Sequence, residues 1–363
     1  MDYFNNFSSN TLAGSGNQLF FCRDDETALV KSCTLYKVFA EGSYSYSFLF
    51  SNIIDSTFSN GLISHKNLVI DSWTIEEAYV GVSSFCDEHS FKQPKGIKQV
   101  SFSGEKQKIV NPGEVFSSDP VELNIKDGEY VCLEITFSGK TIPYHEESII
   151  PSFVYQNGEW IASKLHPFAS MIGVDRNAKK RIAFLGDSIT QGIGTPINSY
   201  AHWNAVFAEK LGSDYAYWNL GLGFGRADDA ASDGIWLFKA KQNDIVFVCF
   251  GVNDILQGYN ADKIKSNLQL IVDKLHEAGV IVIVQTVPPF DYSPEHQIIW
   301  HDVNHFILNN LKNTAFVFDC VGFLSESEQE PHKAKYGGHP NQEGCRIWGE
   351  ALFDAVISSK ILL

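Results

Sequence analysis

Lys180-Arg181-Ile182-Ala183-Phe184-Leu185-Gly186-Asp187-Ser188 is the stretch that decides the fold of the second half of this 363-residue sequence. A near-continuous apolar run ends directly in glycine, aspartate and serine, and comparable runs follow at residues 244–250, 280–284 and 315–318. Such runs are typical of strands that are buried on both faces of a parallel sheet. The pattern therefore predicts a parallel sheet whose first strand ends just before Ser188.

Helical patterns separate these runs, and the clearest one covers residues 261–278 and ends at Gly279. Its apolar residues recur at i, i+4, i+7 and i+11 on one face of an amphipathic helix: Ile264, Leu268, Ile271 and Leu275. Strands that alternate with helices in this way predict a three-layer α/β domain.

The first half of the chain has a different pattern, which is typical of β structure. Residues 130–137 alternate apolar and polar side chains, as a half-buried strand does. Similar short runs recur with turn-forming residues between many of them: 35–39, 46–50, 68–70, 78–82 and 97–102. These runs predict an all-β sandwich or jelly roll. Its boundary is expected between residues 164 and 179, giving domains 1–170 and 171–363.

Composition excludes several classes of partner. The formal net charge is −15 and the pI is near 5.1, which argues against nucleic acid and anionic lipid as partners. No apolar run approaches the ~20 residues of a membrane span, and the first seven residues lack the positive region of a secretory signal. Seven scattered cysteines without C-x-x-C pairs suggest reduced thiols. We therefore expect a cytoplasmic protein; the oligomeric state is not predicted.

Ser188 follows a buried strand directly, and the carboxyl ends of such strands are where open α/β sheets place their ligand sites. Two other interpretations compete with a reactive serine. A serine after a strand often caps the next helix. A phosphate-binding loop is the second alternative, although Gly192 and Gly194 lack the Lys-Ser/Thr of that motif.

Three further blocks accompany Ser188. A glycine-rich turn at residues 219–226 offers backbone N–H groups, Gly251-Val252-Asn253-Asp254 offers an amide, and Gly337-Gly338-His339-Pro340-Asn341 offers an imidazole. Acyl transfer needs a nucleophile, a base that takes its proton, and donors that face the oxyanion of the tetrahedral intermediate. The four blocks supply all of these roles. Asp187 and Asp254, which adjoin two blocks, are expected to bind local backbone N–H groups.

Taken together, the blocks resemble the GDSL family of hydrolases, also called SGNH hydrolases, over residues 180–350. The resemblance implies a flavodoxin-like three-layer SGNH hydrolase domain preceded by the all-β sandwich or jelly-roll domain. It implies Ser188 as nucleophile and His339 as base, with oxyanion donors from the Ser188 backbone, the glycine of the second block and the Asn253 side chain. Neither a metal nor an organic cofactor is expected.

One departure from the family pattern concerns the base. The family usually has Asp three residues before the histidine, and here that position is Tyr336. In a triad the carboxylate orients the imidazole and stabilises its charged form. Three explanations are open: a backbone carbonyl orients His339, a carboxylate such as Glu330 or Asp319 substitutes, or the enzyme is weak or inactive. The Tyr336 hydroxyl could itself form a hydrogen bond near the site.

A second departure concerns the oxyanion glycine. Counted without a gap from Asn219, the family's glycine falls on Phe224. A one-residue insertion makes Gly225 the donor instead, and Gly225 is the residue predicted here. A metal site at His301 and His305 is not expected, because no third ligand is evident.

The first half also resembles the β domain that precedes the hydrolase domain in a bacterial subgroup that includes carbohydrate esterases. The similarity lies in residues 101–104, 111–114 and 117–121. It favours an O-acetylated sugar as the substrate of a serine esterase. The alternatives are a short-chain lipase, lysophospholipase or thioesterase of the same family, or a non-catalytic glycan-binding protein on a hydrolase scaffold.

Overall fold

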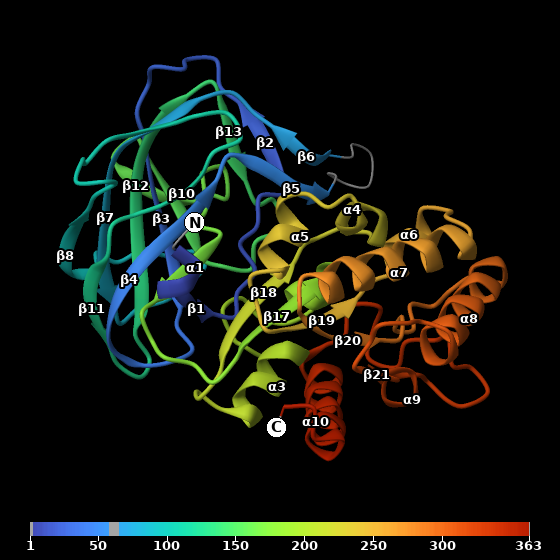
Figure 1. The fold of residues 1–363 in the computed structure, drawn as a ribbon. Coiled ribbons are helices and arrows are strands. Elements are labelled where there is room, and N and C mark those ends of the chain that lie inside the picture. The colour runs from blue at the N-terminus through green and yellow to red at the C-terminus, as the bar shows by residue number, and fades with distance from the viewer. Residues whose placement is uncertain (1–2, 58–64, 363) are drawn as a thin grey trace. The chain divides into compact units, whose positions relative to one another are not determined.

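The computed structural model describes residues 3–57 and 65–362 (Figure 1). The chain divides into two compact units, Met1–Ala178 and Lys179–Leu363. Each unit has its own secondary-structure class, and each is described by itself below.

The described strands of the first unit pair with one another in antiparallel fashion, which confirms the prediction of β structure for this half of the chain. One sheet has the order β10-β4-β16-β1, and β11 also pairs with β4; a second has the order β15-β14-β3-β12-β7-β8, and β9 also pairs with β7. Two further two-stranded sheets pair β13 with β2 and β5 with β6. The elements are α1 (Tyr3–Asn6), β1 (Ser8–Thr11), β2 (Leu19–Cys22), β3 (Val30–Lys37), β4 (Gly42–Ser51), β5 (Ile53–Thr57), β6 (His65–Val69), β7 (Trp73–Ser83), β8 (Lys95–Val100), β9 (Lys108–Val110), β10 (Val115–Ser117), β11 (Val121–Ile125), β12 (Tyr130–Gly139), β13 (Thr141–Tyr144), β14 (Ser152–Gln156), β15 (Glu159–Ala162) and β16 (Met171–Val174).

Strand β12 lies at the centre of its sheet, between β3 and β7, and covers the predicted strand at residues 130–137. The alternating pattern predicts that one face meets solvent, but Glu134 on that face is buried and pairs with Lys31 at 2.5 Å. Side chains from β3, β12 and β14 form a small core beside it, covered by Cys86, Phe91 and Trp160. A loop and a hairpin thus cover a face that the period-2 pattern alone assigns to water.

The second unit contains a parallel sheet in the order β18-β17-β19-β20-β21, which is the flavodoxin-like order. This confirms the predicted parallel α/β architecture. The predicted apolar runs form β17, β19, β20 and β21. The elements are β17 (Arg181–Gly186), α2 (Ser188–Gln191), α3 (Trp203–Leu211), β18 (Ala216–Gly221), α4 (Ala227–Ala231), α5 (Ile235–Ala240), β19 (Ile245–Cys249), α6 (Val252–Leu256), α7 (Ala261–Glu277), β20 (Ile281–Gln285), α8 (Pro294–Asn309), β21 (Phe316–Phe318), α9 (Val321–Leu324) and α10 (Gln342–Ser359).

Helices cover both faces of this sheet (Figure 1). Helices α3 and α10 lie side by side on one face, where Trp203 stacks on Trp348 with ring centroids 5.0 Å apart. Helices α4, α5 and α7 lie on the other face. The large aromatic side chains of this unit are core material rather than a cleft lining, since the following are all buried: Trp203, Tyr217, Trp218 and Trp300.

Helix α7 confirms the predicted amphipathic helix. Asn260 caps it by accepting a hydrogen bond from the backbone N–H of Lys263 at 2.9 Å. The four residues of its predicted apolar face are all buried: Ile264, Leu268, Ile271 and Leu275. Within residues 3–57 and 65–362, no helix is long and apolar enough to cross a membrane.

A pair of substitutions on α7 measures how much this packing stabilises the fold. Leu268→Ala removes a buried side chain, so it should lower the free energy of unfolding by about 2–5 kcal/mol through lost burial and the cavity left behind. Leu270, two residues away, is 42% exposed, so Leu270→Ala should change the free energy by less than about 0.5 kcal/mol. Urea unfolding of the full chain measures both, and equal effects would contradict the assigned helix face.

Candidate active site

Ser188 is the first residue of α2, immediately beyond the carboxyl end of β17. The cap of this helix is Asp187, whose carboxylate accepts a hydrogen bond from the N–H of Ile189 at 2.9 Å. The alternative interpretation of Ser188 as the capping residue is therefore wrong. A first helical residue has no partner for its N–H within the helix. The backbone N–H of Ser188 is thus available to a bound group.

Two glycines allow α2 to lie directly against the strand ends. A Cβ atom on Gly221, the last residue of β18, would lie 2.1 Å from the backbone nitrogen of Gln191. A Cβ atom on Gly186 would lie 2.1 Å from Oγ1 of Thr190. Any side chain at either position would push the helix away, and Ser188 with it. A glycine is therefore needed at position 186, because any larger residue would collide with α2.

His339 meets Ser188 across 151 residues of sequence, with Nε2 2.7 Å from the serine Oγ. The loop that carries His339 is held at its far end by Asn341, which donates its N–H to the Tyr336 carbonyl at 3.1 Å and caps α10 through Gly344. Its near side lies against Gly194, where a Cβ atom would be 2.9 Å from the His339 carbonyl oxygen. The structure therefore places the predicted nucleophile and the predicted base in hydrogen-bonding contact.

The environment of the His339 ring favours its neutral form. The side chain is half-buried, and burial lowers the pKa of His339 below its ordinary value. The Phe290 ring meets the imidazole edge to face, with centroids 5.7 Å apart and planes at 79°. A neutral imidazole can accept the proton of the serine hydroxyl, which is the role of a general base.

No carboxylate of the described residues pairs with the His339 ring. Oδ1 of Asp319 accepts hydrogen bonds from Thr286 at 2.9 Å and from the N–H of Val321 at 3.0 Å. Glu330 pairs with Lys333 instead. Both carboxyls that were predicted as substitutes are thus engaged elsewhere, because α9 and the following turn hold them.

The other two orienting groups that the sequence suggested are also not seen at the ring. Tyr336 packs under the start of α10, where a Cβ atom on Gly344 would lie 2.6 Å from the Tyr336 Cβ. No backbone carbonyl of the described residues hydrogen-bonds Nδ1 of His339. The imidazole is therefore held by its bond to Ser188 and by packing against Phe290, a contact that no motif in the sequence indicated.

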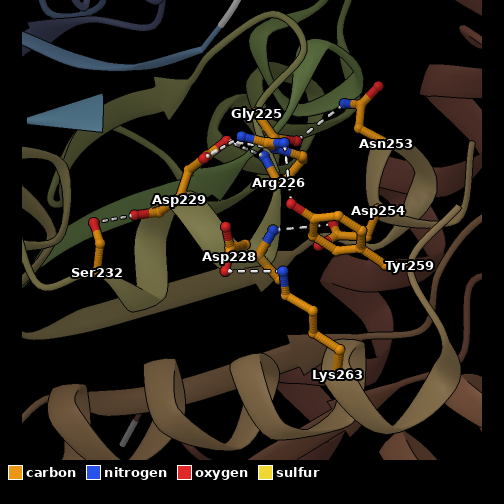
Figure 2. A network of polar contacts seen from close by, with 10 residues as sticks. Gly225, Arg226, Asp228, Asp229, Ser232, Asn253, Asp254, Tyr259 and Lys263 are labelled. Atoms are coloured by element: carbon orange, nitrogen blue, oxygen red, sulfur yellow. Dashed lines mark hydrogen bonds and ion pairs between the residues drawn. The ribbon is translucent and has the colours of Figure 1, made fainter. Parts of the chain in front are cut away.

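The predicted oxyanion residues Gly225 and Asn253 lie together, at the ends of the segments that follow β18 and β19. The Asn253 side-chain amide donates to the Gly225 carbonyl oxygen at 3.0 Å (Figure 2). The N–H of Gly225, predicted to face the oxyanion, instead donates to the Leu222 carbonyl at 3.0 Å within a turn. Phe224, at the ungapped family position, has a left-handed backbone with φ of 58°. The turn thus uses Gly225 to hold Asn253.

The two acidic neighbours of these blocks bind backbone N–H groups, but only one of them does so locally. Asp187 binds the N–H two residues ahead, as expected. Asp254 accepts from the N–H of Ala227 at 3.0 Å, a residue 27 positions earlier. Burial raises the pKa of each of the two carboxyls to about 7. The long-range partner of Asp254 could not be found from the sequence, because it depends on β18 and β19 flanking β17 in the sheet.

A parallel α/β sheet with a strand-end serine bonded to a histidine defines the class of serine hydrolases. Residues 184–347 match the model of the GDSL-like Lipase/Acylhydrolase family, so the second unit contains a domain of that family. An arylesterase of Vibrio mimicus is 25% identical over 134 residues, which is 35% of this chain and 64% of that protein. The match therefore spans just under two thirds of the relative's length.

Two solved structures are among those similar to this chain. A putative lipolytic protein of the G-D-S-L family from Desulfitobacterium hafniense is 20% identical with a TM-score of 0.40, covering 50% of this chain and 99% of its own. A family two carbohydrate esterase from Cellvibrio japonicus is 12% identical with a TM-score of 0.40, covering 98% of this chain and 97% of its own.

Substitution of the two displaced carboxyls tests whether either acts through His339. Glu330→Gln and Asp319→Asn should each change the hydrolysis rate by less than about threefold, because a carboxylate that orients a catalytic imidazole would cost roughly 10⁴-fold when neutralised. Steady-state kinetics on a 4-nitrophenyl ester measures this. A loss of several hundredfold in either variant would assign that carboxyl to the site.

The pKa of His339 gives a prediction for the pH profile. A protonated imidazole cannot accept the serine proton, so kcat/KM should fall as the pH decreases through this pKa. Because burial lowers the pKa, the half-maximal point should lie below about pH 6.5. Tyr336→Asp, which restores the family residue, should move it to higher pH by favouring the imidazolium. An unchanged profile in this variant would mean that the new carboxylate does not reach the ring.

Proposed function

We propose that this protein hydrolyses carboxylic esters through an acyl-Ser188 intermediate. The observation that carries the proposal is the 2.7 Å contact between Ser188 Oγ and His339 Nε2. A hydroxyl in contact with a neutral imidazole at the end of a parallel strand has both a proton acceptor and an approach for the substrate.

The reaction then proceeds in two halves. Nε2 of His339 takes the serine proton while Oγ of Ser188 attacks the ester carbonyl carbon. The resulting oxyanion is held by the Ser188 N–H and by the Asn253 amide. The imidazolium returns its proton to the alcohol oxygen as the C–O bond breaks. Water, deprotonated by His339, attacks the acyl-enzyme and releases the acid.

The preferred substrate is an O-acetylated sugar. The buried ring of Trp236 packs against Gly225, where a Cβ atom would lie 2.6 Å from it. Phe290 has the same relation to Gly338, at 2.7 Å. Two aromatic rings thus pack against glycines of the site. A neutral sugar also suits a chain with a net charge of −15 better than an anionic substrate does.

In this proposal the first unit is a sandwich or jelly-roll accessory domain of the subgroup that includes carbohydrate esterases. The support is the sequence resemblance at residues 101–104, 111–114 and 117–121, together with the antiparallel sheets of this unit. None of the seven cysteines, all of which lie in the described residues, forms a disulfide, which supports a reducing, cytoplasmic setting. A short-chain lipid ester or thioester is the alternative within the same chemistry.

A second candidate function is a glycan-binding protein on a hydrolase scaffold. The observation that favours it is the His339 ring, which has no carboxylate partner among the described residues. A base without this partner loses one source of orientation and charge stabilisation. The two candidates differ in whether Ser188 turns over an ester.

Hydrolysis of 4-nitrophenyl acetate distinguishes these options. The wild-type protein should hydrolyse it, and Ser188→Ala should lower kcat/KM by at least about 10³-fold because the nucleophile is gone. Ser266→Ala, an exposed serine on α7, is the matched control and should leave the rate unchanged. Wild-type activity no higher than that of Ser188→Ala would exclude the esterase.

Chain length and sugar substrates then test the acyl preference. The 4-nitrophenyl decanoate ester should be hydrolysed at least about tenfold more slowly than the acetate if the site is built for an acetyl group. An acetylated xylo-oligosaccharide should release acetate at a rate that depends on Ser188. A preference for decanoate would exclude the deacetylase assignment and retain the lipid ester alternative.

A further inference from the structure

The turn after β18 is tied to helix α6 by two hydrogen bonds that run in opposite directions. The Asn253 amide donates to the carbonyl of Gly225 at 3.0 Å, and the N–H of Ala227 donates to Oδ2 of Asp254 at 3.0 Å. Asn253 and Asp254 are consecutive in α6, and Gly225 and Ala227 are two residues apart in the turn. They form a clamp between the segments that end two strands of the sheet (Figure 2).

The Asp254 side of this clamp is the more buried. Asp254 is fully buried, and its other carboxyl oxygen, Oδ1, has no hydrogen-bonding partner among the described residues. A buried carboxyl with one unsatisfied oxygen is costly, because desolvation of a polar group is offset only by bonds that it makes. The hydrogen bond from the N–H of Ala227 to Oδ2 offsets part of this cost, which ties the carboxyl to the turn.

A second set of contacts fixes the turn on its other side. The guanidinium of Arg226 binds Asp229 through Nε at 3.0 Å and Nη2 at 2.7 Å, and Nη1 donates to the Tyr259 hydroxyl at 3.1 Å. The N–H of Tyr259 in turn donates to the carbonyl of Asp254 at 3.0 Å. Bidentate pairing of this kind restricts geometry as well as adding energy.

We propose that Asp254 is a positioning residue that sets the orientation of the Asn253 amide through the turn at residues 225–227. This inference rests on the proposed function, in which Asn253 donates to the oxyanion. The Asn253 amide has two N–H groups, and Gly225 accepts from one of them. The second N–H has a fixed direction only while the Gly225 carbonyl is fixed. Asp254 fixes that carbonyl indirectly, because it binds the N–H of Ala227, which is two residues after Gly225.

The position of Asp254 makes its effect specific to the transition state. Helix α6 has only five residues, Val252–Leu256, so Asn253 and Asp254 share one turn. Release of Ala227 would let the turn move relative to α6 and misalign the donor. A donor that is aligned for the oxyanion acts mainly in the transition state, so its misalignment lowers kcat more than it changes KM.

Three variants test the clamp. Asp254→Ala removes the acceptor, and Asp254→Asn retains an acceptor for Ala227 in a neutral side chain of the same shape. Burial raises the pKa of Asp254 to about 7, so a neutral group is a close substitute near neutral pH. Ala227→Pro removes the donor from the opposite side. Ala227 is the first residue of α4, where proline is tolerated, and Arg226 before it has the extended backbone that proline requires.

Asp244 supplies a matched control. Its Oδ2 accepts from the N–H of Arg181 at 2.7 Å, which is also a bond from a backbone N–H to a carboxylate. This bond lies at the amino ends of β17 and β19, the edge of the sheet opposite to Ser188. Asp244 is exposed whereas Asp254 is buried, so Asp244→Ala reports what loss of the bond itself does without involving the site.

We expect Asp254→Ala and Ala227→Pro each to lower kcat on 4-nitrophenyl acetate by about tenfold, with KM changed less than about twofold. This loss is smaller than the roughly 10²–10³-fold loss that follows removal of a whole oxyanion donor. Asp254→Asn should restore kcat to within about threefold, and Asp244→Ala should leave it within about twofold. In an Asn253→Ala background, Asp254→Ala should lower kcat no further, because it acts through the absent amide.

Several results would overturn the inference. It fails if Asp254→Ala and Asp244→Ala give the same kcat, or if Asp254→Ala costs as much without Asn253 as with it. Thermal unfolding identifies a variant that does not fold; if that is Asp254→Ala, the Ala227→Pro variant decides, and full activity there overturns the clamp. Wild-type protein without hydrolysis overturns the proposed function and this inference with it, whereas an active wild type with an unaffected Asp254→Ala variant overturns only the inference.

Discussion

The close approach of α2 to the ends of β17 and β18 is the constraint on which the rest of the site depends. Gly186 and Gly221 have no side chain at the points where the helix backbone passes, and each hypothetical Cβ atom would lie 2.1 Å from an atom of α2. This approach places the first residue of the helix, Ser188, beyond the sheet edge with its N–H unbonded within the helix. Nucleophile and first oxyanion donor therefore come from one residue.

The base is held by means that differ from those of a triad. Among the described residues, packing against Phe290 and the bond to Ser188 are what restrain the imidazole of His339. Burial without a carboxylate partner lowers the pKa of the ring, whereas a neighbouring anion would raise it. The ring is consequently neutral and ready to accept a proton, but the imidazolium formed during the reaction lacks an adjacent negative charge. The structure thus favours proton acceptance over stabilisation of the charged base.

The residues proposed to hold the oxyanion differ from the base, because many polar contacts fix their position. Asn253, Asp254, Ala227 and Gly225 form the clamp, and Arg226 with Asp229 and Tyr259 supports it. These groups belong to segments that are separate in sequence and adjacent only because β17 lies between β18 and β19 in the sheet. An electrostatic donor is effective when it is aligned before the charge develops, and this network supplies that alignment.

The sequence by itself determined the class of each unit, the amphipathic helix α7, and the four blocks that carry Ser188, the glycine-rich turn, Asn253 and His339. It could do so because buried parallel strands, helical periodicity and strand-end turns each have a local pattern. Only the tertiary structure decided the cap at Asp187, the displacement of Glu330 and Asp319, the contact of Phe290 with His339, and the 27-residue link from Asp254 to Ala227. Burial of Glu134 was likewise decided by a covering loop and hairpin. Each of these depends on which segments become neighbours when the sheet forms, and a local pattern contains no information about that.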